Sequence, residues 1–431
     1  MVRTSPTPSQ HGAVERAALV GLASGAPKRD AAERSLEELA GLARAAGAEV
    51  ALRLVQDKAR PDPATCLGAG KVEWLAAAAA ESGISLVIFD DELTPAQSRN
   101  LERALSCRVI DRTQLILDIF ARRARTREGK LQVELAQLKY LLPRLVGAGA
   151  ELSRLGGGIG TRGPGETQLE TDRRKIRQRI ATLQRDIAGI RQRRQQLRER
   201  RRRSEMPTIA LVGYTNAGKT TIFNLLAGQQ SVVSDALFVT LDPLVRQIRL
   251  ADRRSALLSD TVGFIDRLPH TLVAAFRATL EEVAEADLLL HVVDASSGER
   301  ERHVRAVTTV LEEVGAIDVP AVLVWNKVDL LDAVDRERLA RVAPSALLFS
   351  ARTTEGREEL LAAVAARLGL DTARVRLEFD AASADDRARI ARLYREARVV
   401  SHEAARGRVT VEADIPRRFL DRLAPAAGSR P

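Results

Sequence analysis

Short apolar runs alternate with longer amphipathic stretches through the first 130 residues of the chain. The apolar runs lie at residues 17–22, 49–55, 86–89 and 108–110, and the helical stretches lie at 31–46, 71–82, 95–106 and 112–123. Runs of this length are typical of strands, and helices between successive strands favour parallel pairing. The pattern predicts an N-terminal α/β subdomain with a mainly parallel sheet over residues 13–128, after a disordered tail at 1–12.

The next stretch has helical periodicity and predicts a hairpin of two helices over residues 129–206. The first helix is expected at 130–145, where Pro143 should end it. The second is expected at 168–205, because its apolar residues recur at heptad spacing and need an antiparallel neighbour to cover them. Between the helices, residues 146–167 hold eight glycines. A loop of this length in a compact domain is usually functional or disordered.

From residue 207 to 370, apolar strands and helices alternate again, and polar motifs follow the strands at their carboxyl ends. Open α/β sheets bind ligands along that edge, so the pattern predicts a nucleotide-binding domain. Residues 371–431 predict a small α+β domain. Its expected strands are 375–379 and 408–412, and its expected helix is 384–397. The predicted fold class is α/β, with a helical hairpin and a small C-terminal appendage.

The positive charge of the protein is concentrated in one predicted helix. The chain has a formal net charge of +10, from 67 Lys and Arg against 57 Asp and Glu. Residues 168–205 hold 14 of these cationic residues and five acidic ones, a net charge of +9. A solvated helix face usually mixes the two signs, so this helix is expected to bind nucleic acid. Few aromatic residues lie near it, which favours structured RNA over single strands.

Several functional classes are disfavoured by the composition. The two cysteines, Cys66 and Cys107, cannot build a disulfide framework and have no CxxC spacing, which indicates a reducing cytoplasm and no zinc site. The longest apolar runs are too short to span a membrane. His291 lies in an apolar run, where a hydrogen-bonded core histidine is expected rather than a metal ligand. Residues 68–71 resemble a phosphate loop, but Thr65 stands in place of its first glycine and Val72 in place of its Ser or Thr, so an ordinary turn is expected.

The strand predicted at 209–213 runs directly into a phosphate loop of the form GxxxxGK[ST]. Glycines let backbone N–H groups wrap a phosphate, Lys219 reaches the β- and γ-phosphates, and the Thr220 hydroxyl can ligate Mg²⁺. The helix that follows, from about Thr221, points its positive end at the same anion. The expected nucleotide-binding residues of this loop are Gly213, Tyr214, Thr215, Asn216, Ala217, Gly218, Lys219, Thr220 and Thr221.

Three further motifs each follow a predicted strand, and together they indicate a guanine nucleotide. In DTVG, Asp260 can hold Mg²⁺ through water, and the N–H of Gly263 can sense the γ-phosphate. In NKVD, the Asp329 carboxylate can accept two N–H groups of guanine that adenine lacks. The expected contacts are Asp260, Thr261, Val262 and Gly263, then Asn326, Lys327, Val328 and Asp329, and finally Ser350, Ala351 and Arg352 near the guanine O6.

The segment between the phosphate loop and DTVG is the expected switch I. Thr240 is the candidate whose hydroxyl completes the Mg²⁺ shell, and Asn216 is a candidate ligand for K⁺ beside the phosphates. Many GTPases place a glutamine after DxxG to orient the attacking water, and Phe264 stands there instead. The expected nucleotide contacts of switch I are Phe238, Val239, Thr240, Leu241 and Asp242. The catalytic candidates are Lys219, Thr240, Asp260 and Gly263.

These motifs lie within longer strings that resemble those of HflX-type GTPases, relatives of the Obg group. Besides the phosphate loop, the strings are VIDRT (109–113), LQVELA (131–136), GPGET (163–167), FIDRLPHTLV (264–273) and TLEE (279–282). The resemblance covers roughly residues 63–352. Two positions depart from the family pattern. Pro243 is followed by Leu-Val-Arg instead of Thr-Thr-Arg, and Cys66 replaces an aliphatic residue.

The resemblance implies a cytoplasmic GTP hydrolase that uses Mg²⁺, cycles between GTP and GDP, and acts on the large ribosomal subunit. Splitting of stalled or idle ribosomes is the implied activity, with helix 168–205 and loop 146–167 as the expected contacts to ribosomal RNA. Hydrolysis is expected to be slow without the ribosome. A monomer without a membrane anchor is expected.

Three alternatives to ribosome splitting remain open at this point. The first is a ribosome-assembly GTPase without splitting activity. The second is a non-enzymatic RNA-binding scaffold, which the intact Lys219, Thr220 and Asp260 disfavour. The third is a membrane-surface GTPase that binds anionic lipid through its basic helix, although that helix lacks a wide apolar face.

Overall fold

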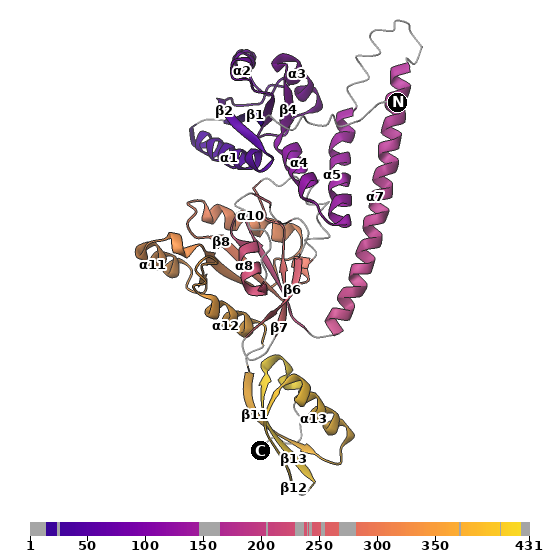
Figure 1. The fold of residues 1–431 in the computed structure, drawn as a ribbon, viewed down its shortest axis with the longest axis vertical. Helices are drawn as coiled ribbons and strands as arrows, with labels where there is room; N and C mark the ends of the chain where they lie inside the picture. Colours follow the sequence, from indigo (N-terminus) through magenta and orange to yellow (C-terminus); the bar gives the residue numbers. More distant parts are fainter. Residues whose placement is uncertain are drawn as a thin grey trace.

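The computed structural model describes residues 14–23, 26–145, 164–203, 206–228, 237–238, 240, 244–250, 255–266, 282–369, 372–405 and 407–423. Within these ranges the chain forms three separate sheets that follow one another along the long axis of the molecule, with a two-helix hairpin beside the first two (Figure 1). The expected N-terminal tail, residues 146–163 of the Gly-rich loop, and Val239, Leu241 and Asp242 of switch I lie outside the described residues.

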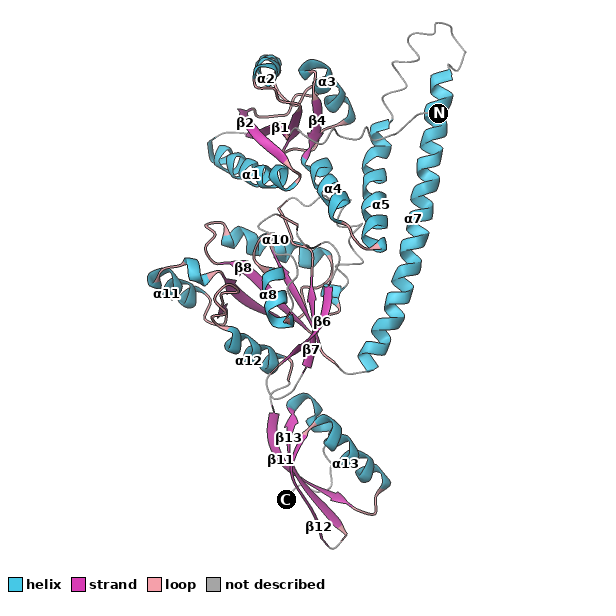
Figure 2. Cartoon of the chain, viewed as in Figure 1, coloured by secondary structure: helices cyan, strands magenta, loops and turns pink. Residues whose placement is uncertain are grey.

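The N-terminal sheet is parallel throughout and covered by helices on both faces, as the alternating pattern predicted (Figure 2). Its strands are β1 (Glu15–Ala23), β2 (Ala48–Asp57), β3 (Leu86–Phe89) and β4 (Arg108–Asp111), in the order β2-β1-β3-β4. One face carries α1 (Ala26–Ala45) and α4 (Arg112–Arg123), and the other carries α2 (Ala69–Glu81) and α3 (Pro95–Leu105). Gly68, in extended backbone, is the N-cap of α2, so residues 68–71 form an ordinary turn into a helix.

The hairpin pairs α5 (Arg127–Arg144) with the 40-residue α7 (Pro164–Arg203). Leu183 and Ile187 of α7 are buried against Leu135 of α5, which confirms the predicted antiparallel seam. Pro143 lies inside α5 rather than at its end, but the helix continues for only one further residue, to Arg144, close to the expected end at 145. A proline this close to the C-terminal end removes only one of the last backbone hydrogen bonds.

The second sheet has the order β10-β9-β8-β5-β7-β6, with β6 antiparallel to β7 at one edge and the other pairs parallel. This antiparallel edge strand was not predicted. The strands are β5 (Thr208–Gly213), β6 (Leu244–Arg249), β7 (Ser255–Asp260), β8 (Leu288–Asp294), β9 (Ala321–Asn326) and β10 (Leu347–Leu348). The described helices around them are α8 (Lys219–Ala227), α10 (Arg300–Glu313), η4 (Val328–Leu330), α11 (Ala333–Val342) and α12 (Arg357–Arg367).

The third sheet is small and antiparallel, in the order β11-β13-β12, with helix α13 packed on it. Its strands are β11 (Thr372–Asp380), β12 (Arg398–Ala405) and β13 (Arg408–Pro416), its main helix is α13 (Ala384–Glu396), and η5 (Arg417–Phe419) and α14 (Leu420–Leu423) end the described chain. The predicted α+β appendage is confirmed, although β12 was missed. Its burial pattern shows no buried position, so it lacks the apolar run that marks a strand.

The first two sheets share one buried cluster. The core beneath α1 and α4 includes Phe120 of α4 and extends to four residues of the second sheet's loops, Tyr214, Phe238, Val262 and Ile265. All four are less than a tenth exposed. The N-terminal subdomain is therefore packed directly against the loops at the carboxyl edge of the second sheet. Across the described ranges, no helix combines the length and the apolar character that a membrane crossing requires.

Candidate nucleotide-binding site

The phosphate loop connects β5 to α8 through two glycines that no other residue could replace. Gly213 has φ +154°, and a Cβ there would lie 2.2 Å from the carbonyl oxygen of Val292. Gly218 has φ +93°, and a Cβ there would lie 2.2 Å from Nδ2 of Asn326. Gly218 is also the N-cap of α8, which begins at Lys219 rather than near Thr221. The positive end of α8 therefore faces the loop, where it favours a bound anion.

Lys219 is buried within this loop, with 6% of its surface exposed. Its Nζ donates hydrogen bonds to the carbonyl oxygens of Gly213 at 3.0 Å and Tyr214 at 2.8 Å. Burial lowers the pKa of Lys219 to about 8, while the nearby Asp260 carboxylate acts in the opposite direction. A buried ammonium with few partners gains strongly from a phosphate, so the loop is built to take an anion beside Lys219.

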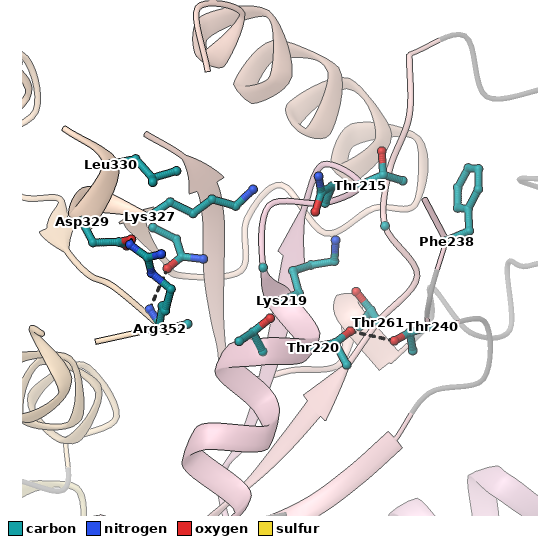
Figure 3. A pocket seen from close by; sticks show the side chains of 16 residues that line it. Thr215, Lys219, Thr220, Phe238, Thr240, Thr261, Lys327, Asp329, Leu330 and Arg352 are labelled. Atoms are coloured by element: carbon teal, nitrogen blue, oxygen red, sulfur yellow. Dashed lines mark hydrogen bonds and ion pairs between the residues drawn. The ribbon is translucent and has the colours of Figure 1, made fainter. Parts of the chain in front are cut away.

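Three oxygen-bearing side chains converge next to Lys219. Oγ1 of Thr220 and Oγ1 of Thr240 lie 2.8 Å apart (Figure 3). Both hydroxyls donate to Oδ2 of Asp260, at 2.8 Å and 2.7 Å. Asp260 is fully buried, its pKa is raised by that burial, and its Oδ1 has no hydrogen-bond partner. An unpartnered carboxylate oxygen beside two hydroxyls is a hard oxygen donor set of the kind Mg²⁺ prefers. The residues present therefore fit the expected magnesium ion.

The DTVG segment approaches the phosphate loop closely. A Cβ on Gly263 would lie 3.0 Å from Nζ of Lys219 and 2.9 Å from Cγ2 of Thr215, so the position requires glycine. The backbone of Phe264 pairs with the loop, since its N–H bonds to Gly213 and its carbonyl accepts from Thr215. The Phe264 ring itself is 1% exposed and packs in the core beneath α10, away from the pocket. The residue in the usual glutamine position thus offers no side chain to the site.

The guanine-reading motifs meet at the other end of the same pocket. Asn326 donates from Nδ2 to the carbonyl of Ala217 at 2.8 Å and accepts from the N–H of Ala351 at 3.1 Å, which ties three loops together. The carboxylate of Asp329 accepts a hydrogen bond from Oγ of Ser350 at 2.6 Å and pairs with Arg352 at 2.6 Å. The Ser350 hydrogen bond is the main cause that lowers the pKa of Asp329. This carboxylate is ionised and positioned to accept N–H donors.

Fifteen of the residues singled out in the sequence line one cavity of about 340 Å³, with Lys219 between the threonine group and the base-reading group (Figure 3). They are Thr215, Asn216, Gly218, Lys219, Thr220, Thr221, Phe238, Thr240, Thr261, Gly263, Asn326, Lys327, Asp329, Ala351 and Arg352. The other described candidates lie behind this lining, namely Gly213, Tyr214, Ala217, Asp260, Val262, Val328 and Ser350.

Two residues of the site were missed by sequence reasoning. Leu330 lines the cavity directly after NKVD and is 58% exposed. Asp294 ends β8 and accepts a hydrogen bond from Nζ of Lys327 at 2.7 Å, which fixes the lysine beside the pocket. The signal that could have found Asp294 was its place at the carboxyl end of a buried strand, where polar residues collect in such sheets.

His291 is a core residue as expected, but it does not have the hydrogen bond that was expected for its ring. It lies in the buried strand β8, at 8% exposure, as a core residue should. Its Nε2, however, has no hydrogen-bond partner. Burial lowers its pKa to about 4, so the ring is neutral near pH 7. Among the residues that the structure describes, no group of three or more His, Cys, Asp or Glu is arranged to hold a metal ion.

Three protein-family models match most of the region that carries the first two sheets and the hairpin, leaving β1 and β10 outside their ranges. Residues 33–121 match a family described as the GTP-binding GTPase N-terminal, and residues 123–201 match its middle region. Residues 208–327 match a family described as a 50S ribosome-binding GTPase.

Two HflX relatives support the same assignment. The chain is 49% identical over 358 residues to the GTPase HflX of Caldanaerobacter subterraneus subsp. tengcongensis, covering 83% of this chain and 82% of that one. It is 45% identical over 417 residues to the GTPase HflX of Magnetococcus marinus, covering 96% and 95%. Among solved structures, the chain also resembles a GTP-binding protein from Sulfolobus solfataricus in complex with GDP, at 25% identity and a TM-score of 0.45, covering 83% of this chain and 99% of that one. The chain belongs to the HflX family of GTPases, and it binds and hydrolyses GTP.

Proposed function

We propose that this GTPase binds the large ribosomal subunit in its GTP form, through α7 and the Gly-rich loop 146–167, and promotes the separation of ribosomal subunits. The family match to 50S ribosome-binding GTPases supports the partner. The net positive charge of α7 is the observation that carries the proposal, because it supports a contact with the phosphates of ribosomal RNA. Such a partner confines the activity to the cytoplasm.

The exposed side of α7 is suited to a polyphosphate. Leu183 and Ile187 are buried against α5, whereas the described basic residues Arg174, Lys175 and Arg177 are exposed. Arg179 is exposed as well, but it makes a bidentate pair with Glu134 of α5 at 2.7 and 2.8 Å, and Lys175 lies 3.6 Å from Asp172 of its own helix. The helix thus uses one side to hold the hairpin together and leaves cationic side chains available for phosphates on the other.

The site geometry supports a hydrolysis that the protein alone performs slowly. Thr220, Thr240 and Asp260 would hold Mg²⁺, directly or through water, and the ion would neutralise charge on the β- and γ-phosphates. Lys219 would bind the same phosphates. Phe264 points into the core, so the position after DTVG offers no side chain that could orient the attacking water. We propose that the ribosome supplies this positioning, helped by a K⁺ ion on Asn216, which lines the pocket in left-handed backbone at φ +60°.

Sedimentation with ribosomal subunits tests this proposal. The protein should pellet with large subunits in the presence of a non-hydrolysable GTP analogue, and much less with GDP or without nucleotide. Light scattering should then show separation of 70S particles on addition of the GTP form. Deletion of residues 156–160 should abolish that separation without changing nucleotide affinity. Equal pelleting in all three nucleotide states would contradict a GTP-controlled ribosome switch, whereas binding without separation would leave a ribosome-assembly GTPase.

A further inference from the structure

The two switch segments of the GTPase site are in contact with the N-terminal subdomain. Phe238 lies two residues before Thr240, and its ring is 2% exposed. It packs edge-on against the ring of Phe120 in α4, with centroids 4.7 Å apart and an interplanar angle of 80°. Leu237 is packed against α1, where a Cβ added to Gly41 would lie 3.2 Å from its Cδ1. Switch I is therefore anchored on both helices of this layer.

The second switch, switch II, begins at DTVG, and its described part, residues 260–266, is held by a polar network. Tyr214, the second residue of the phosphate loop, stacks on His303 of α10, with ring centroids 4.0 Å apart. Its hydroxyl donates to the Glu38 carboxylate of α1 and accepts the backbone N–H of Asp266 at 2.7 Å. Asp266 lies three residues after Gly263. A hydrogen bond from α1 thus reaches the segment that follows the γ-phosphate sensor through one tyrosine.

Arg112 fixes Glu38 in this network. Its guanidinium is 4% exposed and pairs with both Glu38 and Asp90, the latter at 2.7 Å. The same group reaches the carbonyl of Asp266 at 3.4 Å. A buried ion pair of this kind contributes geometry more than net stability, because desolvation offsets much of the attraction. Its position at the base of α4 therefore fixes where the Glu38 carboxylate can meet Tyr214.

The backbone conformation of Phe238 indicates that the surrounding residues hold switch I in place. Phe238 has φ +58°, in the left-handed region that non-glycine residues rarely occupy. Such a conformation persists only where the surroundings hold it, and here the surroundings include the Phe120 ring. Two residues later, Thr240 makes its hydrogen bond with Asp260. The packing of Phe238 on the N-terminal subdomain and the hydrogen bond of Thr240 to Asp260, which defines the closed position of Thr240, therefore occur together.

We propose that Phe120 and Glu38 are positioning residues for GTP hydrolysis: the N-terminal subdomain holds switch I through Phe238 and switch II through Tyr214 and Asp266. Neither residue lines the nucleotide cavity. Both act through a neighbour that belongs to the phosphate loop or to switch I. Because GTP requires Thr240 in its closed position and GDP does not, the contact between Phe120 and Phe238 favours GTP selectively. By reciprocity, bound GTP strengthens the attachment of the N-terminal subdomain.

A double-mutant cycle tests the aromatic contact. In the full chain, Phe120→Ala and Phe238→Ala should each weaken the binding of a fluorescent GTP analogue by about 3- to 10-fold, which is the range expected for loss of an aromatic pair. The affinity for GDP should stay unchanged. The double variant should be no weaker than either single variant. Phe120→Leu should restore most of the affinity. Phe89→Leu, in the opposite layer of the same sheet, is the control and should lower the melting temperature without changing the preference for GTP over GDP.

A second pair tests the polar network. Tyr214→Phe keeps the stack on His303 and removes both hydroxyl hydrogen bonds, so kcat should fall several-fold with KM unchanged. Glu38→Ala should have the same effect, and Glu38→Gln, which keeps an acceptor for the tyrosine, should recover some of the lost kcat. The proposal is overturned if the aromatic variants weaken GTP and GDP equally, if their effects add in the double variant, or if the Tyr214 and Glu38 variants change melting temperature alone.

Discussion

The carboxylate of Asp329 is paired with Ser350, whose hydroxyl donates to it at 2.6 Å, although the two residues lie 21 positions apart. This pairing joins the loop after β9 to the loop after β10 and leaves the carboxylate ionised. The residue that should select guanine is therefore already oriented by its own serine partner. Its role in base selection can be tested directly.

Asp329→Asn is expected to weaken GTP binding by roughly 10- to 100-fold, because hydrogen bonds to a charged acceptor are lost. The same variant should prefer xanthosine triphosphate, since xanthine presents an acceptor where guanine has an amine. A competition assay with both nucleotides measures the change. Asp332→Asn, at the exposed N-cap of α11, is the matched control and should keep the preference for guanine. Unchanged base preference in Asp329→Asn would assign guanine selection to another group.

Replacing Arg174 and Arg177 of α7 with Gln should weaken ribosome binding and reduce its dependence on salt. For each phosphate contact that is lost, the plot of log binding constant against log salt concentration should become less steep by about 0.7 to 0.9. Pelleting across a salt series gives both values. Replacement of Arg338 and Arg341, two exposed arginines of α11, removes the same charge and should leave the slope unchanged. Equal slopes in both variants would show that α7 is only a solvated surface.

Turnover should be higher in K⁺ than in Na⁺, and Asn216→Ala should remove the difference. The asparagine side chain is exposed and lines the pocket, where its oxygen can ligate a monovalent cation beside the phosphates. Phosphate release in matched chloride salts provides the measurement.

Large ribosomal subunits should stimulate the basal rate of GTP hydrolysis by roughly 3 to 5 orders of magnitude if they supply the missing groups. Fast turnover without ribosomes would contradict the stimulation, and equal rates in both salts would contradict the cation site alone.

The nucleotide-binding sheet should lose stability in mild acid because of His291. Burial lowers the pKa of His291 to about 4, against about 6.5 in an unfolded chain. The unfolded state therefore gains a proton first as pH falls, and up to roughly 3 kcal/mol of stability is lost between pH 6.5 and 4. His291→Leu should reduce this loss. Fluorescence of Trp325, buried in the neighbouring strand β9, follows unfolding in a Trp74→Phe background.

A control histidine separates this effect from general acid denaturation. His402 lies in the third sheet and bonds to Tyr394 through its Nδ1. His402→Gln should keep the acid sensitivity of the Trp325 signal. If His291→Leu and the parent protein lose stability equally between pH 6.5 and 4, the cause lies in the carboxylates instead.

Much of the fold could be read from the sequence because its local patterns are strong. The eight elements of the N-terminal subdomain follow apolar runs and helical periodicity, and each is present within a few residues of its expected bounds. The strand β6 was missed because its segment, Leu244–Arg249, has only one buried position. An edge strand with little burial gives a weak hydrophobic signal.

The candidate site was predictable for a different reason: phosphate, Mg²⁺ and guanine each require particular side chains at fixed spacing. The direction of Phe264 was not predictable, because the identity of a residue does not specify the side of the strand end on which it lies. The Tyr214 contact with Glu38 spans 176 positions. No local pattern encodes such a contact, because the hydrogen bond depends on how α1 packs against the phosphate loop of a different sheet.

Because α7 is long, a small rotation at one end of the hairpin displaces its other end by a large distance. Forty residues at 1.5 Å rise per residue extend for about 60 Å. The helix ends at Arg203, and β5, which leads into the phosphate loop, begins at Thr208. A rotation of about 5° at that base would displace the far tip by roughly 5 Å, about one helical turn. If the nucleotide state rotates that base, the far end of α7 therefore moves much farther than the nucleotide site itself, which is the displacement that the proposed separation of subunits would require.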